Sequence, residues 1–132
     1  MRDQVDIVVT SMGDMNHPHD LYRWFLEQGG MEVQTLLARG WIGNVQYRPY
    51  HRTGPVTEQA CDQRVVTLFE LADYVEMVTR GRRHVVRMAA PCSRCGQPRS
   101  EALRPLLTES RLKVWSHLVT DLNTARALLA DA

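Results

Sequence analysis

The chain is organised around the stretch PCSRCGQP, which occupies residues 91–98. Its two cysteines, Cys92 and Cys95, can bind one tetrahedral metal ion, because the tight turn between them brings both sulfur atoms to the same point. Gly96 allows the backbone to turn with a positive φ angle directly after the second cysteine. The prolines at both ends exclude a continuous helix through the stretch. The spacing therefore predicts one half of a zinc site, in the form of a knuckle.

A complete zinc site needs two further ligands, and the chain contains no second Cys-x-x-Cys pair. Cys61 is the only other cysteine, and His84 lies eight residues before Cys92, at the start of a predicted strand. We therefore predict a mixed set of sulfur and nitrogen ligands: Cys92, Cys95, Cys61 and His84. His117 is the alternative nitrogen ligand.

Other interpretations of the cysteine pair need no metal. The thiols can be free and partly buried, since free cysteine behaves as a small hydrophobic residue, or they can form a disulfide. A redox pair of the thioredoxin type requires the first cysteine to open a helix, which would lower its pKa. Pro98 disfavours a helix that begins at Cys92.

Length and composition favour a single domain that covers residues 1–132. With 44% hydrophobic residues the chain can bury a core, and no apolar run approaches the roughly 20 residues that cross a bilayer. The first residues, MRDQVD, include acids where a secretory signal would be basic and then apolar. We expect a soluble, cytoplasmic protein with reduced thiols and no membrane association.

Charge is distributed unevenly along the chain. Residues 1–79 contain six arginines and eleven acidic residues, whereas residues 80–104 contain seven arginines and one acid. This basic segment, residues 80–104, includes the cysteine pair. Arginine suits bidentate contacts with phosphate, so the segment predicts binding to nucleic acid or another anionic partner. The predicted contact residues are Arg80, Arg82, Arg83, Arg87, Arg94 and Arg99, together with Tyr47 and Arg48 from a stretch that interleaves aromatic and cationic side chains.

Hydrophobic periodicity predicts both strands and helices. Strands are expected at residues 5–10, 31–38, 41–48 and 83–89, although residues 31–38 alternate only weakly. Helices are expected at residues 18–29, 57–80 and 109–129, with a short helix in residues 100–107 that Pro105 interrupts. The order β-α-β-β-α-β, followed by the knuckle and a C-terminal amphipathic helix, is typical of an α+β fold of the ferredoxin-like, split β-α-β type. A different α+β sandwich is the alternative.

Capping residues predict where the helices begin and end. Asn16 or His17 would cap the first helix, and its apolar face would carry Leu21, Trp24 and Phe25. The second helix would begin at Thr57 and stop at Gly81.

Two carboxylates, an amide and two imidazoles lie in the stretch DMNHPHD, residues 14–20, after the first predicted strand. One interpretation is a metal or general-base site that uses Asp14, His17, His19 and Asp20. The other interpretation is helix capping within a solvated turn. No recognised metal-binding spacing is present, so the sequence favours capping.

Three functions from different classes are consistent with these features. The first is a binding module in which zinc holds the basic segment toward nucleic acid or another anionic partner. The second is a regulatory adaptor that docks a protein partner through the knuckle and the C-terminal helix, residues 109–129, whose apolar stripe could also form a homodimer. The third is a small enzyme, which ranks last because the spacing identifies no nucleophile–base pair.

Overall fold

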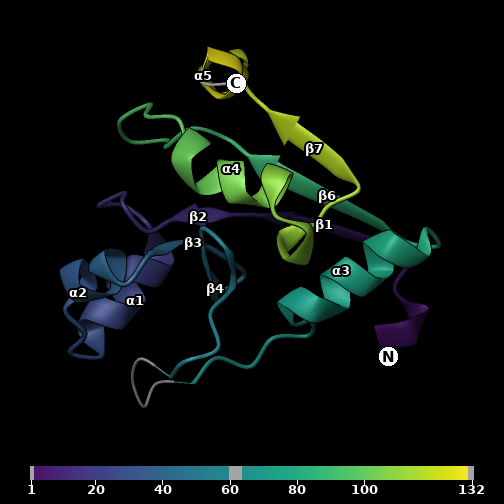
Figure 1. The fold of residues 1–132 in the computed structure, drawn as a ribbon, viewed down its shortest axis with the longest axis horizontal. Coiled ribbons are helices and arrows are strands. Elements are labelled where there is room, and N and C mark those ends of the chain that lie inside the picture. The colour runs from purple at the N-terminus through teal and green to yellow at the C-terminus, as the bar shows by residue number, and fades with distance from the viewer. Residues whose placement is uncertain (1, 60–63, 131–132) are drawn as a thin grey trace.

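The computed structural model describes residues 2–59 and 64–130, and in this part of the chain the strands form two sheets (Figure 1). The first sheet is parallel, with the order β1-β6-β7, and consists of β1 (Ile7–Ser11), β6 (His84–Ala89) and β7 (His117–Thr120). The second sheet is antiparallel, with the order β2-β3-β4-β5, and consists of β2 (Gly13–Asp14), β3 (Trp41–Val45), β4 (Arg48–His51) and β5 (Gly54–Pro55).

The helices connect and cover these strands. The α-helices are α1 (Leu21–Gln28), α2 (Val33–Ala38), α3 (Leu71–Arg80), α4 (Ser100–Thr108) and α5 (Leu122–Ala130). Two 3-10 turns, η1 (Arg2–Gln4) and η2 (Ser110–Leu112), complete the regular structure of the described residues.

The main hydrophobic core lies on one face of the parallel sheet. Val8, Val85 and Ala89 project from the strands into a cluster with Tyr74 of α3 and Leu103 of α4. The connections from β1 to β6 and from β6 to β7 lead in the same direction across the sheet. Right-handed crossovers in one direction place their helices on the same face. A smaller core lies between α1, α2 and β3, and its buried residues are Met15, Tyr22, Leu26, Val33, Leu36 and Trp41.

The mixture of helices and strands agrees with the α+β prediction, but the ferredoxin-like arrangement is not confirmed. That arrangement needs one antiparallel sheet, whereas the strands here form a parallel sheet and a separate antiparallel sheet. Residues 33–38 form helix α2 instead of a strand. Their weak alternation is therefore overridden by packing, since Val33 and Leu36 are buried against α1 and β3.

The predicted C-terminal helix over residues 109–129 is wrong. That segment forms η2, then strand β7, and then the shorter helix α5. Strand β7 pairs in parallel with β6, with Val86 opposite His117 and Ala89 opposite Thr120. Valine and threonine favour strands, and this pairing completes the edge of the sheet.

The predicted helix over residues 57–80 is mostly wrong as well, because α3 begins only at Leu71. Glu70 caps it in a capping box with Asp73, in place of the predicted Thr57. The predicted end is confirmed, since Gly81 follows the helix with a φ angle of 65°. Cys61 lies outside the described residues.

Helix α1 begins at Leu21, and its cap is Asp20 in place of Asn16 or His17: the Arg23 backbone N–H donates to Oδ1 of Asp20 at 2.9 Å. Its buried residues are Tyr22 and Leu26. Leu21 and Trp24 are 61% and 55% exposed, so the predicted apolar face was wrong. No helix among the described residues combines the length and apolarity required to span a bilayer.

Candidate metal centre

Two loops meet at the carboxyl end of the parallel sheet. The loop after β1 carries His17 and His19, and the loop after β6 carries Cys92 and Cys95. Strands β1 and β6 are parallel neighbours, and the last residue of β1, Ser11, pairs with Met88. Both loops therefore leave the sheet side by side, although more than 70 residues separate them in the sequence.

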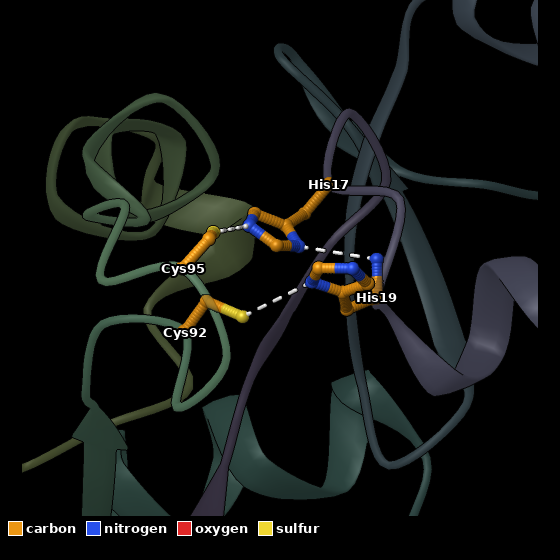
Figure 2. Close-up of side chains that lie close together, drawn as sticks. All are labelled: His17, His19, Cys92 and Cys95. Atoms are coloured by element: carbon orange, nitrogen blue, oxygen red, sulfur yellow. Dashed lines mark hydrogen bonds between the residues drawn. The ribbon is translucent and has the colours of Figure 1, made fainter.

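The four side chains converge on one point. Nε2 of His17 lies 3.0 Å from Sγ of Cys95, and Nδ1 of His19 lies 3.5 Å from Sγ of Cys92 (Figure 2). All four ligand atoms lie within 4.8 Å of one another. A zinc ion with its usual bond lengths holds nitrogen and sulfur ligands about 3.6 Å apart in a tetrahedron. The four residues therefore fit a zinc ion with only small adjustments.

The cysteine loop has the local geometry of a metal-binding knuckle. The backbone N–H of Gly96 donates to the carbonyl oxygen of Cys92 at 2.8 Å, and Gly96 has a φ angle of 71°, as the sequence predicts. The backbone N–H of Arg94 points at Sγ of Cys92 at 3.4 Å. The hydrogen bond from this N–H is the main reason that the pKa of Cys92 is lowered to about 6. Hydrogen bonds with Cys95 and His19 also lower this pKa, whereas burial raises it. A thiolate is the form that binds metal.

The histidine loop is held by hydrogen bonds from its two flanking aspartates. The backbone carbonyl oxygen of Asp14 accepts a hydrogen bond from the backbone N–H of His17 at 3.0 Å. The side-chain Oδ1 of Asp14 accepts one from the backbone N–H of Asn16 at 2.9 Å. The backbone N–H of Asp20 donates to the carbonyl oxygen of His17 at 3.1 Å. The His19 N–H donates to Nδ1 of His17 at 3.2 Å. These turns direct both imidazole rings toward the cysteine loop.

Below the loops, a buried polar cluster joins this site to β3. Nδ2 of Asn44 donates to both carboxylate oxygens of Asp20, at 3.3 and 3.5 Å. Burial is the largest effect on Asp14 and Asp20, and it raises the pKa of both carboxyl groups, while Arg99 acts in the opposite direction. Arg99 also donates to the carbonyl oxygen of Met12. This cluster orients the loop that carries the histidines, as outer partners do in metal sites.

The ligands that the sequence predicted are only partly brought together. Cys92 and Cys95 lie at the cluster, but His84 is at the opposite end of the six-residue strand β6, whose two ends are roughly 17 Å apart at about 3.3 Å per residue. The ring of His84 contacts that of His117 instead, with 5.3 Å between centroids. Sequence reasoning missed His17 and His19 as partners of the cysteines. The sequence does place His17 and His19 after the first strand. This position points to the cysteines only once β1 and β6 are known to be parallel neighbours.

The predicted nucleic-acid contacts do not all lie on one surface, although Arg80, Arg82 and Arg83 line one pocket beside α3. Arg87 is fully buried, where it donates to the carbonyl oxygens of Ser11 and Val114 at 3.3 and 2.8 Å, and burial lowers its pKa to about 10. It cannot reach an external phosphate. Three others form ion pairs: Arg48 with Glu70, Arg80 with Glu76, and Arg83 with Asp3.

Arg82 and Arg94 lie at opposite ends of β6. Arg82 precedes β6 and Arg94 follows it, and both are exposed. The ring of Tyr47 packs against those of Tyr22 and Phe25, with centroids 5.8 and 6.1 Å apart. It is therefore part of the smaller core and not an open stacking platform.

No protein-family model and no curated protein matches the sequence. Solved structures do match the fold. The sorbitol operon regulator SorC from Klebsiella pneumoniae has a TM-score of 0.70 at 20% identity, with 97% of this chain and 36% of that chain covered. A domain assigned as the sugar-binding domain of a transcriptional repressor from Vibrio fischeri has a TM-score of 0.61 at 21% identity, with 96% and 45% covered. A transcriptional regulator from Streptococcus pneumoniae has a TM-score of 0.59 at 16% identity, with 98% and 44% covered.

These similarities establish the fold. The chain spans less than half the length of each of these regulators.

Proposed function

We propose that this chain is a regulatory binding module in which one zinc ion holds the ligand-binding edge of the sheet together. His17, His19, Cys92 and Cys95 would supply the four ligands. The observation that carries this proposal is the convergence of nitrogen and sulfur atoms from two loops, 73 and 78 positions apart in the sequence, within 4.8 Å.

The set of donor atoms favours zinc over other metals. Two thiolates and two imidazoles form a tetrahedral set of the kind that structural zinc sites use. Hard cations such as Mg²⁺ and Ca²⁺ prefer oxygen ligands. Four protein ligands fill the tetrahedron and leave no position for a water molecule or a substrate, which supports a structural role for the metal.

Such an ion would cross-link the loop after β1 to the loop after β6. At a free zinc concentration 100 times the dissociation constant, it would stabilise the fold by about 2.7 kcal/mol. The main core does not include the four ligand residues. We therefore expect metal loss to loosen the two loops without unfolding the chain.

The fold similarity supports the regulatory part of the proposal. The matching proteins are an operon regulator, a domain assigned as sugar-binding and a transcriptional regulator. In open α/β sheets, ligands bind outside the carboxyl ends of the strands, and the four proposed ligand residues follow those ends of β1 and β6. Zinc would fix the shape of this edge and so determine which effector can bind beside it.

Contact with nucleic acid or another anionic partner is a second candidate. It is favoured by Arg94, which is exposed and lies between the two cysteines in the knuckle. A bound metal would hold this guanidinium group in a defined position.

Native mass spectrometry of the purified chain tests the zinc site. We expect one zinc ion per chain, lost in the variants His17→Ala, His19→Ala, Cys92→Ser and Cys95→Ser. His84→Ala is the matched control, because His84 lies at the far end of β6, and Cys61→Ser tests the remaining predicted ligand; both should keep the ion. Zinc retained in the His17→Ala/His19→Ala double variant, or lost in His84→Ala, would refute this ligand set.

A further inference from the structure

The two cysteines of the candidate metal centre differ in their access to solvent. Cys92 is buried, with 5% of its surface exposed, and its sulfur atom lies beside His19 (Figure 2). Cys95 is exposed. The whole stretch of residues 93–98 is exposed with it. The cysteine loop therefore presents one cysteine to solvent and keeps the other beneath it.

The same loop holds the two thiols at a spacing that a disulfide can close. Both cysteines are free, and their sulfur atoms lie within 4.8 Å of each other. Cys92 and Cys95 are the first and fourth residues of the turn that the Gly96 N–H closes on the carbonyl oxygen of Cys92. Tight turns hold their first and fourth Cα atoms within about 7 Å, and a disulfide spans Cα atoms up to about 6.8 Å apart. Rotation of the two side chains can therefore bring the sulfur atoms together.

A disulfide and a zinc ion compete for the same two sulfur atoms. Metal binding requires the thiolate form of cysteine, which a disulfide no longer has. Oxidation would leave only His17 and His19, both from the loop after β1, as ligands. Two imidazoles are half of the tetrahedral set that a structural zinc site needs. Disulfide formation would therefore release the ion and remove the link between the two loops.

We propose that the metal centre is a redox switch, in which a hydroperoxide oxidises Cys95 and Cys92 to a disulfide and zinc leaves the site. The switch rests on the proposed function, because it needs zinc bound by the four residues. The exposed Cys95 meets the oxidant, and the buried Cys92 resolves the product. Accessible cysteines next to a resolving cysteine are typical of redox sensors. The pair is not of the thioredoxin type, because α4 begins only at Ser100.

The oxidation proceeds in two steps at sulfur. The Cys95 thiolate attacks one oxygen of hydrogen peroxide, the O–O bond breaks, and a sulfenic acid and a hydroxide form. The Cys92 thiolate then attacks the sulfur of this sulfenic acid, so that the S–S bond forms, the S–O bond breaks and a second hydroxide leaves. Two protons from solvent convert both hydroxides to water. The two sulfur atoms together lose two electrons, and the peroxide gains them.

The effect of the switch is confined to the edge of the sheet where the two loops meet. The strands are held by the parallel pairing of β1 with β6, which depends on neither cysteine. Reduction by a dithiol would restore both thiolates, so zinc could bind again. The switch would thus couple the supply of peroxide reversibly to the shape of the proposed effector-binding edge.

Zinc release from the Cys61→Ser variant tests the switch, because this variant keeps only the two cysteines of the loop. Hydrogen peroxide is added to the zinc-loaded chain, and a zinc-sensitive dye and mass spectrometry follow the reaction. We expect the bound zinc to be released while the chain loses about 2 Da, the mass of two hydrogen atoms. Treatment with a dithiol should restore both the mass and the zinc binding.

Cys95→His, made in the same Cys61→Ser chain, is the matched control. An imidazole can replace the thiolate as a zinc ligand but cannot form a disulfide. Peroxide should therefore release zinc from this variant at least about tenfold more slowly.

The outcomes separate the switch from the metal centre. A Cys61→Ser chain that binds no zinc before peroxide is added refutes the metal centre, and the switch with it. A chain that binds zinc and keeps it in peroxide, or gains mass through sulfinic or sulfonic acid, overturns the switch alone. Equally fast release from Cys95→His does the same. If Cys95→His binds no zinc, the change in mass of the Cys61→Ser chain decides between the two results.

Discussion

Sγ of Cys92 lies 3.5 Å from Nδ1 of His19, although 73 positions separate the two residues. The contact depends on the parallel pairing of β1 with β6, which brings the ends of both strands to the same edge. A second contact of the same kind, between His17 and Cys95, lies beside it. A metal ion held by these four residues would therefore link two loops, and its removal should have local effects.

If zinc occupies the proposed site, its chelation should accelerate amide hydrogen exchange in the cysteine loop. The N–H groups of Arg94 and Gly96 bond to Cys92, so they depend on the position of this cysteine. Helix α3 packs in the main core, and its exchange rates should not change. Hydrogen exchange measured with and without chelator checks this prediction. Equal acceleration in α3 would mean that the metal stabilises the whole fold.

Gly13→Ala should lower both the stability and the zinc affinity. A Cβ atom on Gly13 would lie 2.1 Å from Oδ2 of Asp20 and 2.3 Å from Nδ2 of Asn44. Both groups belong to the buried cluster below the histidine loop. Overpacking of this kind costs roughly 1–3 kcal/mol, which urea denaturation of the metal-free chain would measure.

Gly30→Ala is the control for Gly13→Ala. Nothing lies within 4 Å of a Cβ atom on Gly30, but its φ angle of 79° makes the substitution cost about 1–2 kcal/mol. Its zinc affinity should therefore equal that of the unmodified chain. Unchanged zinc affinity in Gly13→Ala would show that the cluster does not position the ligands.

Arg87→Ala should be strongly destabilising, whereas Arg82→Ala should not. Arg87 donates to the part-buried carbonyl oxygen of Ser11 and to the buried one of Val114, and it lies 5.1 Å from the centre of the Tyr74 ring. Removing it leaves a cavity and unpaired acceptors, at a cost of roughly 2–5 kcal/mol. Arg82 is exposed, and its loss should change stability by less than about 0.5 kcal/mol. Urea denaturation measures the free energy of unfolding of both variants. A larger loss in Arg87→Ala than in Arg82→Ala supports a structural role for Arg87, and equal losses would contradict it.

Retention of single-stranded RNA on a filter should depend on Arg94 if the knuckle binds phosphate. Removing one arginine that neutralises a phosphate makes the slope of log affinity against log salt concentration shallower by about 0.7 for a single strand. Arg94→Ala should show this decrease, whereas Arg80→Ala removes an arginine that is paired with Glu76 and should change the slope less. An absence of salt-dependent retention by the unmodified chain would remove this second candidate.

Glu58→Gln should reduce the stability at neutral pH more than at pH 3. Nε1 of Trp41 donates to the Glu58 carboxylate at 2.8 Å and is the largest cause that lowers its pKa from 4.5 to about 2, with a smaller effect from His51. Because the folded-state pKa lies below the unfolded value, this contribution is present above pH 4.5 and is lost as the pH falls toward 2. The side chain is 39% exposed, so the loss at neutral pH should stay below about 1 kcal/mol.

Urea denaturation of the metal-free chain at pH 7 and pH 3 measures this difference without contributions from the metal ligands. Glu76→Gln is the control, since Glu76 pairs with Arg80 on the exposed side of α3. An identical effect of Glu58→Gln at both pH values would exclude the proposed ionisation effect.

Local sequence predicted those features that depend on neighbouring residues alone. The strands at residues 7–11, 41–45 and 84–89 coincide with the predicted ranges to within three residues at each end. Gly81 and Gly96 both have positive φ angles where a helix end and a tight turn were expected. Glycine adopts this region at little cost, so these two positions report their conformation directly.

Longer segments were not predictable in this way. The apolar stripe over residues 109–129 is compatible with one helix, yet residues 117–120 form a strand because β6 offers them a partner. The stretch at residues 31–38 shows the opposite change, from an expected strand to helix α2. In both segments, tertiary packing overrides a local preference of less than about 1 kcal/mol per residue.

The sequence by itself determined that two sulfur atoms would face the same point, because the spacing of Cys92 and Cys95 and the turn at Gly96 are local. Only the tertiary structure decided that His17 and His19 lie opposite them and that His84 does not. The reason is that His84 begins β6 while the cysteines follow it, so the whole length of the strand lies between His84 and the cysteines. Parallel pairing with β1 instead brings the end of a strand from the beginning of the chain next to the cysteine loop, and no local periodicity contains that information.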